Sequence, residues 1–125
     1  MMKVAAAVCI QNGKVLLASR PENKPPSGWE FPGGKLEPGE TPQQAAKREL
    51  LEELNWEVLP LDIIYQLKTP KITLYFVRVI PAGNSTPAPC EGQQIKWETL
   101  SPEFPCGMLE NDRNFWKFIT LSTSR

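Results

Sequence analysis

The sequence contains no histidine among its 125 residues. A histidine base, a Ser–His–Asp arrangement and a histidine metal site are therefore excluded, so acid–base or metal chemistry must rest mainly on carboxylates. Cysteine is also scarce: Cys9, Cys90 and Cys106 are scattered, and their spacing fits no metal site. An odd set of this kind indicates reduced thiols, and a cytoplasmic protein is expected.

No apolar run reaches the roughly 18 residues of a membrane-spanning helix, so no membrane partner is expected. The apolar residues 1–10 have some likeness to a signal peptide, but Asn12-Gly13 leads straight into a second apolar run, which favours a β-hairpin. Lys plus Arg and Asp plus Glu both number 14, and this balance argues against a nucleic-acid polymer as partner. Without repeats or a linker, the chain is predicted to form one domain, 1–125.

Residues 42–54 carry the strongest helix signal. Thr41 is a good N-cap, Pro42 suits the first helical position, and Gln44 completes a capping box. Residues 45–54 contain no glycine and no β-branched side chain, so the helix should continue to Asn55, which tolerates the left-handed conformation that ends helices. At about 100° per residue, one apolar stripe is expected to face the core: Ala46, Leu50, Leu51 and Leu54.

Three glutamates, Glu49, Glu52 and Glu53, gather on another face of this helix. Glu49 and Glu53 form a like-charged i,i+4 pair, and carboxylates near the C-terminal end of a helix also oppose its dipole. Because the cluster weakens the helix, the glutamates are expected to have a function. Binding of a hard divalent cation, which would be shared with phosphate, is the natural candidate. For the helix alone, a solvated acidic face with Arg48 paired to Glu52 is the alternative.

The preceding loop favours the cation, because glycines at 33, 34 and 39 permit close approach to a ligand. Gly34, Glu40 and the run Arg-Glu-Leu-Leu-Glu-Glu-Leu-Asn-Trp at 48–56 are spaced as in the Nudix box. That pattern is Gly-x5-Glu-x7-Arg-Glu-U-x-Glu-Glu-x-Gly-U, where U is a bulky aliphatic residue. Over about a fifth of its length, the chain therefore resembles the Nudix hydrolases, and the MutT-like members in particular.

Two positions depart from the box: Asn55 stands at the late glycine, and Trp56 at the last aliphatic residue. Asparagine is the next best residue at a left-handed cap, so the turn should survive. Extended segments are predicted at 4–10, 14–19, 56–68, 71–80 and 93–100. A closing helix, capped by Asn111 or Asp112, is predicted to run through Leu121. This order predicts an α/β fold, and the resemblance implies the Nudix fold, a curved mixed β-sheet between α-helices. The inward face of the closing helix should carry Phe115, Phe118 and Ile119.

The resemblance also implies a function. Nudix enzymes hydrolyse a nucleoside diphosphate linked to another group, with Mg²⁺ or Mn²⁺ as cofactor. A MutT-like member would convert a small nucleoside triphosphate to the monophosphate and pyrophosphate, as a monomer or a homodimer. Sanitation of oxidised nucleotides such as 8-oxo-dGTP is one expectation. A housekeeping pyrophosphatase for canonical (d)NTPs such as CTP, or for other nucleoside-diphosphate-X substrates, is an alternative. A catalytically silent ligand sensor is a third, but such domains lose the box acids that this chain keeps.

Carried over residue by residue, the resemblance assigns the metal to four groups and a bracing role to an ion pair. Arg48 would pair with Glu40 and orient the loop. The metal ligands would be the side chains of three glutamates and one backbone carbonyl: Glu49, Glu52, Glu53 and Gly33.

The general base is less determined. Many relatives have a further acid in the loop before the late strand, where Glu91 is the best match and Glu98, after Trp97, is the second. Lys96 stands where MutT-type relatives have an acid just before that tryptophan. The base is therefore Glu53, Glu91 or Glu98.

Three residues are candidates for substrate binding. Arg20 stands where relatives have an Arg that contacts phosphate or base, although a surface Arg is an equal alternative. Phe31 would line the base pocket or belong to the core. Asn111 follows a segment similar to the Phe-Pro-Pro-Ala-Asn region of the family, with altered spacing, and its amide offers a purine edge both a donor and an acceptor; helix capping is the alternative. The proline-rich stretch 21–28 is a connector or a flap over the substrate.

Overall fold

The computed structural model describes residues 2–20 and 28–123. The stretch 21–28, predicted to be a connector or a flap, therefore lies outside the described residues except for Gly28. Two helices are present in the described part, α1 (Pro42–Leu54) and α2 (Glu110–Thr123). The strands are β1 (Met2–Val8), β2 (Ile10–Gln11), β3 (Lys14–Ser19), β4 (Trp29–Glu30), β5 (Gly33–Lys35), β6 (Val58–Lys68), β7 (Ile72–Pro81) and β8 (Ile95–Thr99).

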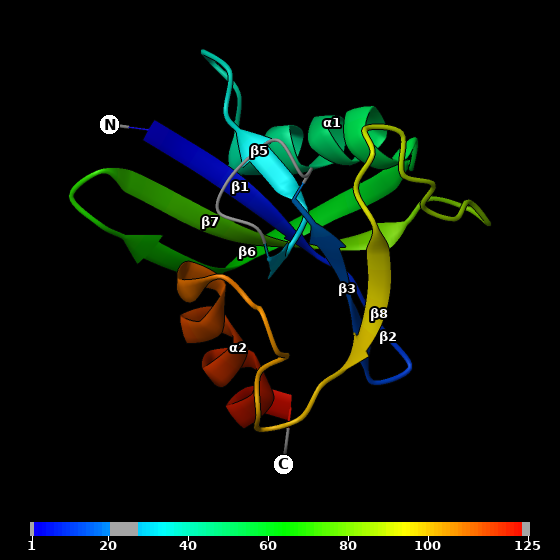
Figure 1. Ribbon diagram of the computed structural model, residues 1–125. Helices are drawn as coiled ribbons and strands as arrows, with labels where there is room; N and C mark the ends of the chain where they lie inside the picture. The colour runs from blue at the N-terminus through cyan, green and yellow to red at the C-terminus, as the bar shows by residue number, and fades with distance from the viewer. Residues whose placement is uncertain (1, 21–27, 124–125) are drawn as a thin grey trace.

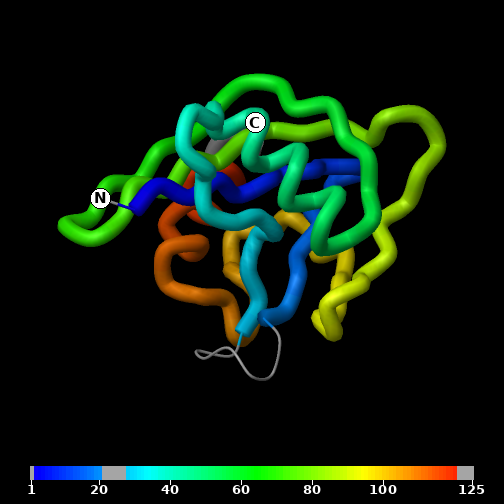
Figure 2. Tube along the Cα trace, turned by 90° about the horizontal axis from the view of Figure 1, so that it is seen from above, coloured from blue at the N-terminus to red at the C-terminus, as the bar shows by residue number. Residues whose placement is uncertain are grey.

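The strands form two sheets (Figure 1). The larger has the order β5-β1-β7-β6, in which β1 pairs with β7 in parallel and the other pairs are antiparallel. In the smaller sheet, β3 pairs antiparallel with β2, β4 and β8. Helices α1 and α2 lie on opposite sides of the larger sheet, and the view from above in Figure 2 shows α1 lying across β1. This arrangement confirms the predicted α/β class and the mixed sheet between helices.

Strand β1 separates two hydrophobic cores. Ala5 and Ala7 pack with the inner face of α1, whereas Ala6 and Val8 pack with Phe115 and its neighbours on α2. Because successive side chains of a strand point to opposite faces, a strand buried on both sides reads as an unbroken apolar run, as residues 4–10 do. The site described below is built between these cores.

The first predicted strand is wrong in one respect. Asn12 and Gly13 form the expected turn, both with positive φ (54° and 73°). However, the chain leaves its sheet at Cys9. Only the two-residue β2 pairs with β3, while β1 pairs with β5 and β7. The turn could be predicted because it depends only on its own two residues, whereas the change of sheet at Cys9 is set by tertiary packing.

The ends of α1 agree with the sequence. The Thr41 hydroxyl oxygen accepts a hydrogen bond from the Gln44 backbone N–H at 3.1 Å, and Gln44 Oε1 accepts one from the Thr41 backbone N–H at 2.9 Å. At the other end, Asn55 adopts the left-handed conformation (φ 46°, ψ 41°). The predicted stripe is wrong at Leu51, which is 47% exposed, whereas Ala45 is fully buried. A narrow stripe suffices because only one side of α1 meets the sheet.

Helix α2 begins before both of the residues predicted to cap it. Since Glu110 is its first residue, Asn111 and Asp112 lie inside the first turn and neither is the cap. The expected inward position of Phe118 is wrong too: it is 40% exposed and stacks beside Tyr65, with ring centroids 4.8 Å apart. Trp116 is buried in its place, because the inward face follows Asp112, Phe115, Trp116 and Ile119. Neither described helix is long and apolar enough to cross a bilayer.

Candidate active site

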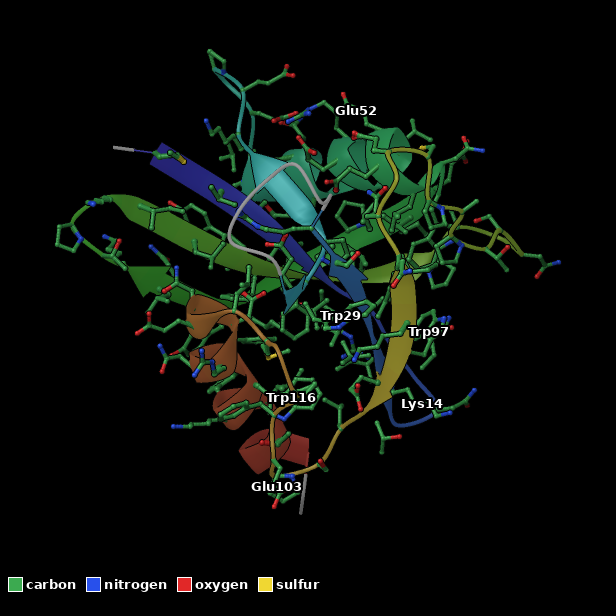
Figure 3. All side chains as sticks on the ribbon, in the orientation of Figure 1. Lys14, Trp29, Glu52, Trp97, Glu103 and Trp116 are labelled. Carbon is green, nitrogen blue, oxygen red and sulfur yellow. The ribbon has the colours of Figure 1, made fainter. Side chains whose placement is uncertain are left out.

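The three glutamates of α1 differ in exposure. The Glu49 side chain is 17% exposed and Oε2 of Glu53 is buried, whereas the Glu52 side chain is 55% exposed. In Figure 3, Glu52 lies on α1 at the upper edge of the molecule. Positions 49 and 53 are one turn apart, so their side chains share a face of the helix, and both line the cavity described below.

Arg48 ties these glutamates to the preceding loop. Its Nε and Nη2 donate to both carboxylate oxygens of Glu40, at 2.8 and 3.0 Å, and Nη2 also donates to the backbone carbonyl of Lys35 at 2.9 Å. Its Nη1 reaches Glu49 Oε1 at 2.9 Å and Glu52 Oε2 at 3.2 Å. The predicted Arg48–Glu40 pair is present in the two-pronged geometry that suits Arg, and the pairing with Glu52 is present too.

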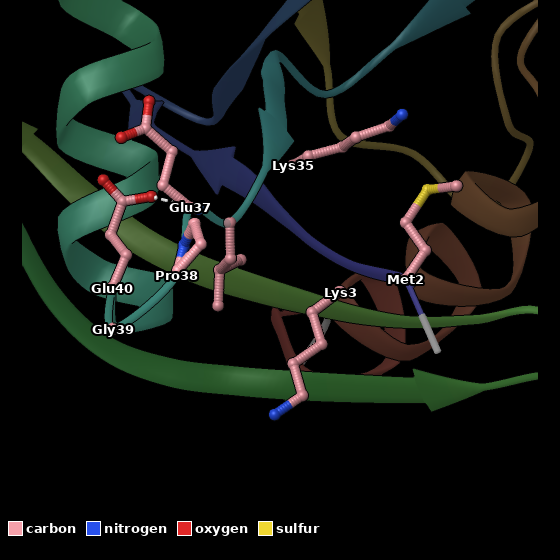
Figure 4. A pocket seen from close by; sticks show the side chains of 8 residues that line it. Met2, Lys3, Lys35, Glu37, Pro38, Gly39 and Glu40 are labelled. Carbon is pink, nitrogen blue, oxygen red and sulfur yellow. Dashed lines mark hydrogen bonds between the residues drawn. The ribbon is translucent and has the colours of Figure 1, made fainter.

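The loop that Glu40 closes is drawn in Figure 4, where Glu40 accepts a bond from the Glu37 backbone N–H at 2.9 Å. The hydrogen bond from Arg48, with this backbone bond, holds the pKa of the Glu40 carboxyl below its usual range. In turn, the Glu40 carboxylate, followed by Glu49, raises the pKa of the Arg48 guanidinium. Both shifts favour the charged forms of the two partners, which fits a structural brace.

Two glycines of β5 let the loop approach its neighbours closely. A Cβ on Gly34 would lie 2.6 Å from each carboxylate oxygen of Glu49, and a Cβ on Gly33 would run into the backbone carbonyl of Ala5 on β1. Any larger residue at Gly34 would therefore displace the Glu49 carboxylate. The glycines provide close packing here, and not a special turn.

Glu91 comes to the same place from the loop between β7 and β8, and it lines the same cavity as Glu49 and Glu53. Burial above all, with the charges of Glu52 and Glu91, raises the pKa of the Glu49 carboxyl, against the opposing effect of its bond to Arg48. The last turn of α1 contains no basic residue. This corner of the protein therefore concentrates negative charge.

The acids are not arranged as a preformed metal cluster. Among residues 2–20 and 28–123, no three His, Cys, Asp or Glu side chains are grouped closely enough to hold an ion. Two of the predicted ligands are instead bonded to Arg48, which donates to the Glu52 carboxylate and to one oxygen of Glu49. The predicted set of three metal-binding glutamates thus stays a prediction.

A cavity of about 850 Å³ extends from the glutamates to the start of α2. We call its two parts the glutamate end, with Glu49, Glu53 and Glu91, and the aspartate end, with Arg20, Glu30, Asn111 and Asp112. The two ends have different charged neighbours: Glu30 and Arg20 shift the pKa of Asp112, whereas Arg48, Glu52 and Glu91 shift that of Glu49.

The aspartate end contains a buried carboxyl. Asp112 is 6% exposed, and its Oδ2 accepts the backbone N–H of Phe31 at 2.9 Å. Burial raises the pKa of Asp112 to about 7, and the nearby Glu30 adds to the rise. Burial also raises the pKa of Glu30, although Arg20, whose Nε lies 3.2 Å from Glu30 Oε2, opposes it.

The predicted substrate residues all border this cavity. Arg20 is partly exposed and paired with Glu30, and Asn111 lies in the first turn of α2. The Phe31 ring is only 3% exposed and packs edge-on against Phe115 at 5.1 Å, so it belongs to the core as much as to the cavity.

Glu30, Gln93 and Asp112 are among the cavity residues that were not anticipated from the sequence. A signal existed for Asp112, because it shares the helical face of Phe115 and Trp116 and an acid on an inward face is unusual. Glu30 and Gln93 lie beside short strands whose pairing cannot be read locally.

Glu98 lies elsewhere. Its Oε1 is 3.1 Å from Lys96 Nζ, which also sits 4.2 Å above the Trp29 ring. Trp97, between them on β8, packs against the core shared with α1, so Lys96 and Glu98 point to the other face of the strand. Glu98 does not line the cavity, which leaves Glu53 and Glu91 as the candidates that do.

Comparison with known proteins adds three results. A model of the NUDIX domain matches residues 1–114. The 8-oxo-dGTP diphosphatase of Haemophilus influenzae is 37% identical over 103 residues, 78% of this chain and 75% of that protein. The CTP pyrophosphohydrolase of Escherichia coli is 52% identical over 58 residues, 46% of this chain and 43% of that protein.

The matched segment spans about half the length of that E. coli relative and of an 8-oxo-dGTP diphosphatase from Proteus vulgaris. Among solved structures, the solution structure of the E. coli ORF135 protein is similar over 100% of this chain and 93% of that one, with 33% identity and a TM-score of 0.81. The expected fold is thereby confirmed.

Proposed function

The chain belongs to the Nudix family, and on this premise we propose that it is a metal-dependent pyrophosphohydrolase that splits a nucleoside triphosphate into the monophosphate and pyrophosphate. One observation carries the proposal: Glu49, Glu53 and Glu91 line one end of a cavity whose other end offers buried hydrogen-bonding groups. A volume of about 850 Å³ lies within the range of small-molecule pockets.

A divalent cation fits the glutamate end. The donors are carboxylate oxygens, which Mg²⁺ and Mn²⁺ prefer. Burial, and after it the charges of Glu52 and Glu91, raise the pKa of Glu49, and a bound cation would favour its ionised form. Gly34 leaves the Glu49 carboxylate a place that any side chain would fill. Glu49, Glu53 and the carbonyl of Gly33 would hold the ion, and Glu52 would join them by leaving Arg48. When bound, such an ion neutralises phosphate oxygens and makes a water more acidic.

The protein's own groups would do the rest. Glu53 and Glu91 are the candidates to accept the proton of the attacking water, and phosphoryl transfer otherwise depends mainly on positioning and charge. Arg48 would not touch the substrate, because its guanidinium is already hydrogen-bonded to Glu40, Glu49 and Glu52. Its role is to keep the loop and the helix in register.

The aspartate end would select the base. An Asp112 carboxyl with a pKa of about 7 can donate or accept a hydrogen bond near neutral pH, and the Asn111 amide can do both. Such a pair suits a base edge that presents donors and acceptors together, as 8-oxo-guanine does. Cytosine presents them too, and the segment shared with the E. coli CTP pyrophosphohydrolase favours CTP as the second candidate.

The test is pyrophosphate release, measured with a coupled pyrophosphatase, over a panel of canonical and oxidised (d)NTPs in Mg²⁺. A kcat/KM for 8-oxo-dGTP well above that for dGTP would support sanitation. A flat profile, or a preference for CTP, would contradict sanitation and keep the hydrolase. If the protein hydrolyses no nucleotide of the panel, no dinucleotide and no nucleotide sugar, the result would favour the ligand sensor.

A further inference from the structure

The loop between β7 and β8 caps the C-terminal end of α1. The last carbonyls of a helix have no partner within it and need donors from elsewhere. Here the backbone N–H of Ala88 donates to Leu54 O at 2.7 Å and that of Cys90 to Glu53 O at 3.0 Å. The Cys90 thiol adds a further donor, with Sγ 3.0 Å from both Glu52 O and Glu53 O. Figure 1 shows this loop rising beside α1.

The same loop is anchored before Ala88 as well. Trp56, which is fully buried just after α1, donates its indole N–H to Ser85 O at 3.1 Å. The loop is therefore attached at Ser85, Ala88 and Cys90 to the last turn of α1 and to the residue Trp56 just after it. The next residue is Glu91.

Glu91 is also held from its other side. Its backbone N–H donates to Gln93 Oε1 at 3.0 Å, and Gln93 is only 8% exposed. Glu91 is thus fixed between a residue bonded to the end of α1 and a buried amide. Its side chain lines the cavity with Glu49 and Glu53, close enough for its charge to raise the pKa of Glu49.

From this geometry we propose that Cys90 is a positioning residue, whose thiol fixes the loop on the last turn of α1 and thereby sets the Glu91 carboxylate opposite Glu49 and Glu53. The inference rests on the proposed function, because it gives Glu91 a part in the reaction. Cys90 itself does not line the cavity. Its effect on turnover therefore passes through Glu91.

A double-mutant cycle tests this role, with kcat and KM measured for Cys90→Ala, Glu91→Gln and the double variant. Cys90→Ala keeps the backbone N–H and loses only the thiol donor. We expect it to lower kcat about three- to ten-fold, the effect of one hydrogen bond, with KM changed less than about two-fold. Glu91→Gln should lower kcat about ten-fold or more. In the double variant, Cys90→Ala should lower kcat by less than a further factor of about two.

Two further variants separate positioning from general destabilisation. Cys90→Ser keeps a donor at the same place and should restore kcat to within about two-fold of wild type. Cys106→Ala removes the other exposed cysteine of the chain and should change nothing. As a readout independent of turnover, hydrogen exchange at the amides of Ala88, Cys90 and Glu91 should be faster in Cys90→Ala than in Cys90→Ser, while the melting temperature stays within a few degrees.

Several results would overturn the inference. It fails if Cys90→Ala has wild-type kcat, if Cys90→Ser loses as much as Cys90→Ala, or if Cys90→Ala costs the same factor with and without Glu91. It also fails if Glu91→Gln is fully active. In each of these cases the wild-type protein still hydrolyses nucleotides and the proposed function stands. A wild-type protein inert on every nucleotide would instead remove the proposed function and this inference with it.

Discussion

The two ends of the cavity are built in opposite ways. The glutamate end draws Gly33, Gly34, Glu49 and Glu53 from 21 consecutive positions, 33–53, and only Glu91 comes from afar. The aspartate end joins Arg20 and Glu30 with the first turn of α2, some 80 residues later, as in the bond from Phe31 to Asp112. One end is local in the sequence, and the other exists only once the chain has folded.

The ends also differ in charge. At the glutamate end, Glu49, Glu53 and Glu91 gather beside a last helical turn that contains no basic residue. Burial raises the pKa of Glu49 here, but its bond to Arg48 opposes the rise. At the aspartate end, burial favours the neutral form of Asp112 and raises the pKa of Glu30. A charged end suits phosphates with a cation, whereas a nearly neutral end suits the uncharged edge of a base. Chemistry and selectivity should therefore respond to different substitutions.

The largest effect is expected at Glu53. Glu53→Gln keeps the shape but removes the charge and the proton acceptor, so kcat should fall about 10²-fold or more for every substrate. Glu57→Gln, on an exposed residue just beyond the helix, is the matched control and should be silent. Steady-state kinetics of both variants on the best nucleotide test this prediction. A loss of kcat of only a few-fold in Glu53→Gln would contradict a catalytic role for Glu53.

The adjacent glycines should separate activity from stability. In Gly34→Ala the new methyl meets the carboxylate of Glu49, which can swing away, so kcat should fall about ten-fold or more with little loss of stability. In Gly33→Ala the methyl meets the backbone of β1, which cannot yield, so the free energy of unfolding should fall by about 1–3 kcal/mol. Denaturant unfolding together with kinetics compares the two variants. Equal behaviour would show that the Glu49 contact is unimportant.

This contrast explains what could be predicted from the sequence. The caps at Thr41 and Asn55, the Arg48–Glu40 pair and the grouping of Glu49 with Glu53 follow from spacing within one helix and its loop. The box spacing, shared with a known family, added the fold.

What could not be predicted depends on contacts between distant segments. Asp112 looked like a helix cap, but packing of Phe115 and Trp116 turns its carboxyl inward to Phe31. Glu98 looked like a possible base, but its parity on β8 sends it to the opposite face from α1. Successive residues of a strand face opposite sides of the sheet, and an earlier helix start changes which side chains point inward, so both outcomes depend on positions that the sequence does not fix.

Asp112→Asn should alter selectivity more than rate. If the aspartate end reads the base, replacing a group that both donates and accepts should change the ratio of kcat/KM between two nucleotides by about ten-fold. The kcat of the best substrate should stay within a few-fold. Glu53→Gln, by comparison, should leave that ratio unchanged. If Asp112→Asn slows all nucleotides equally, the two ends do not divide the work as proposed.

The same substitution should change the pH dependence of stability. Because the folded pKa of Asp112, about 7, exceeds its ordinary value of 3.8, the folded protein holds this proton more tightly. Its stabilising contribution is full below about pH 4 and is lost as the pH rises to about 7, with a slope of at most about 1.4 kcal/mol per pH unit. Asp112→Asn stays neutral, so the stability difference from wild type should vary over this window and be flat above it. Denaturant unfolding of both proteins from pH 4 to 8 measures this difference. If their free energies of unfolding change in parallel with pH, the raised pKa of Asp112 is contradicted.

The smallest effect is expected at Asn55, where the glutamate end departs from its family pattern. Asn55 is left-handed, and glycine adopts that conformation without a Cβ, so Asn55→Gly should raise the free energy of unfolding by a few tenths of a kcal/mol. Asn55→Ala should lower it by about 1 kcal/mol, because alanine tolerates this conformation poorly. Both variants should keep wild-type kcat, since Asn55 lies outside the cavity. Loss of activity in Asn55→Gly would mean that the asparagine side chain matters to the site, whereas unchanged kinetics would show that at this position the glutamate end requires only a backbone conformation.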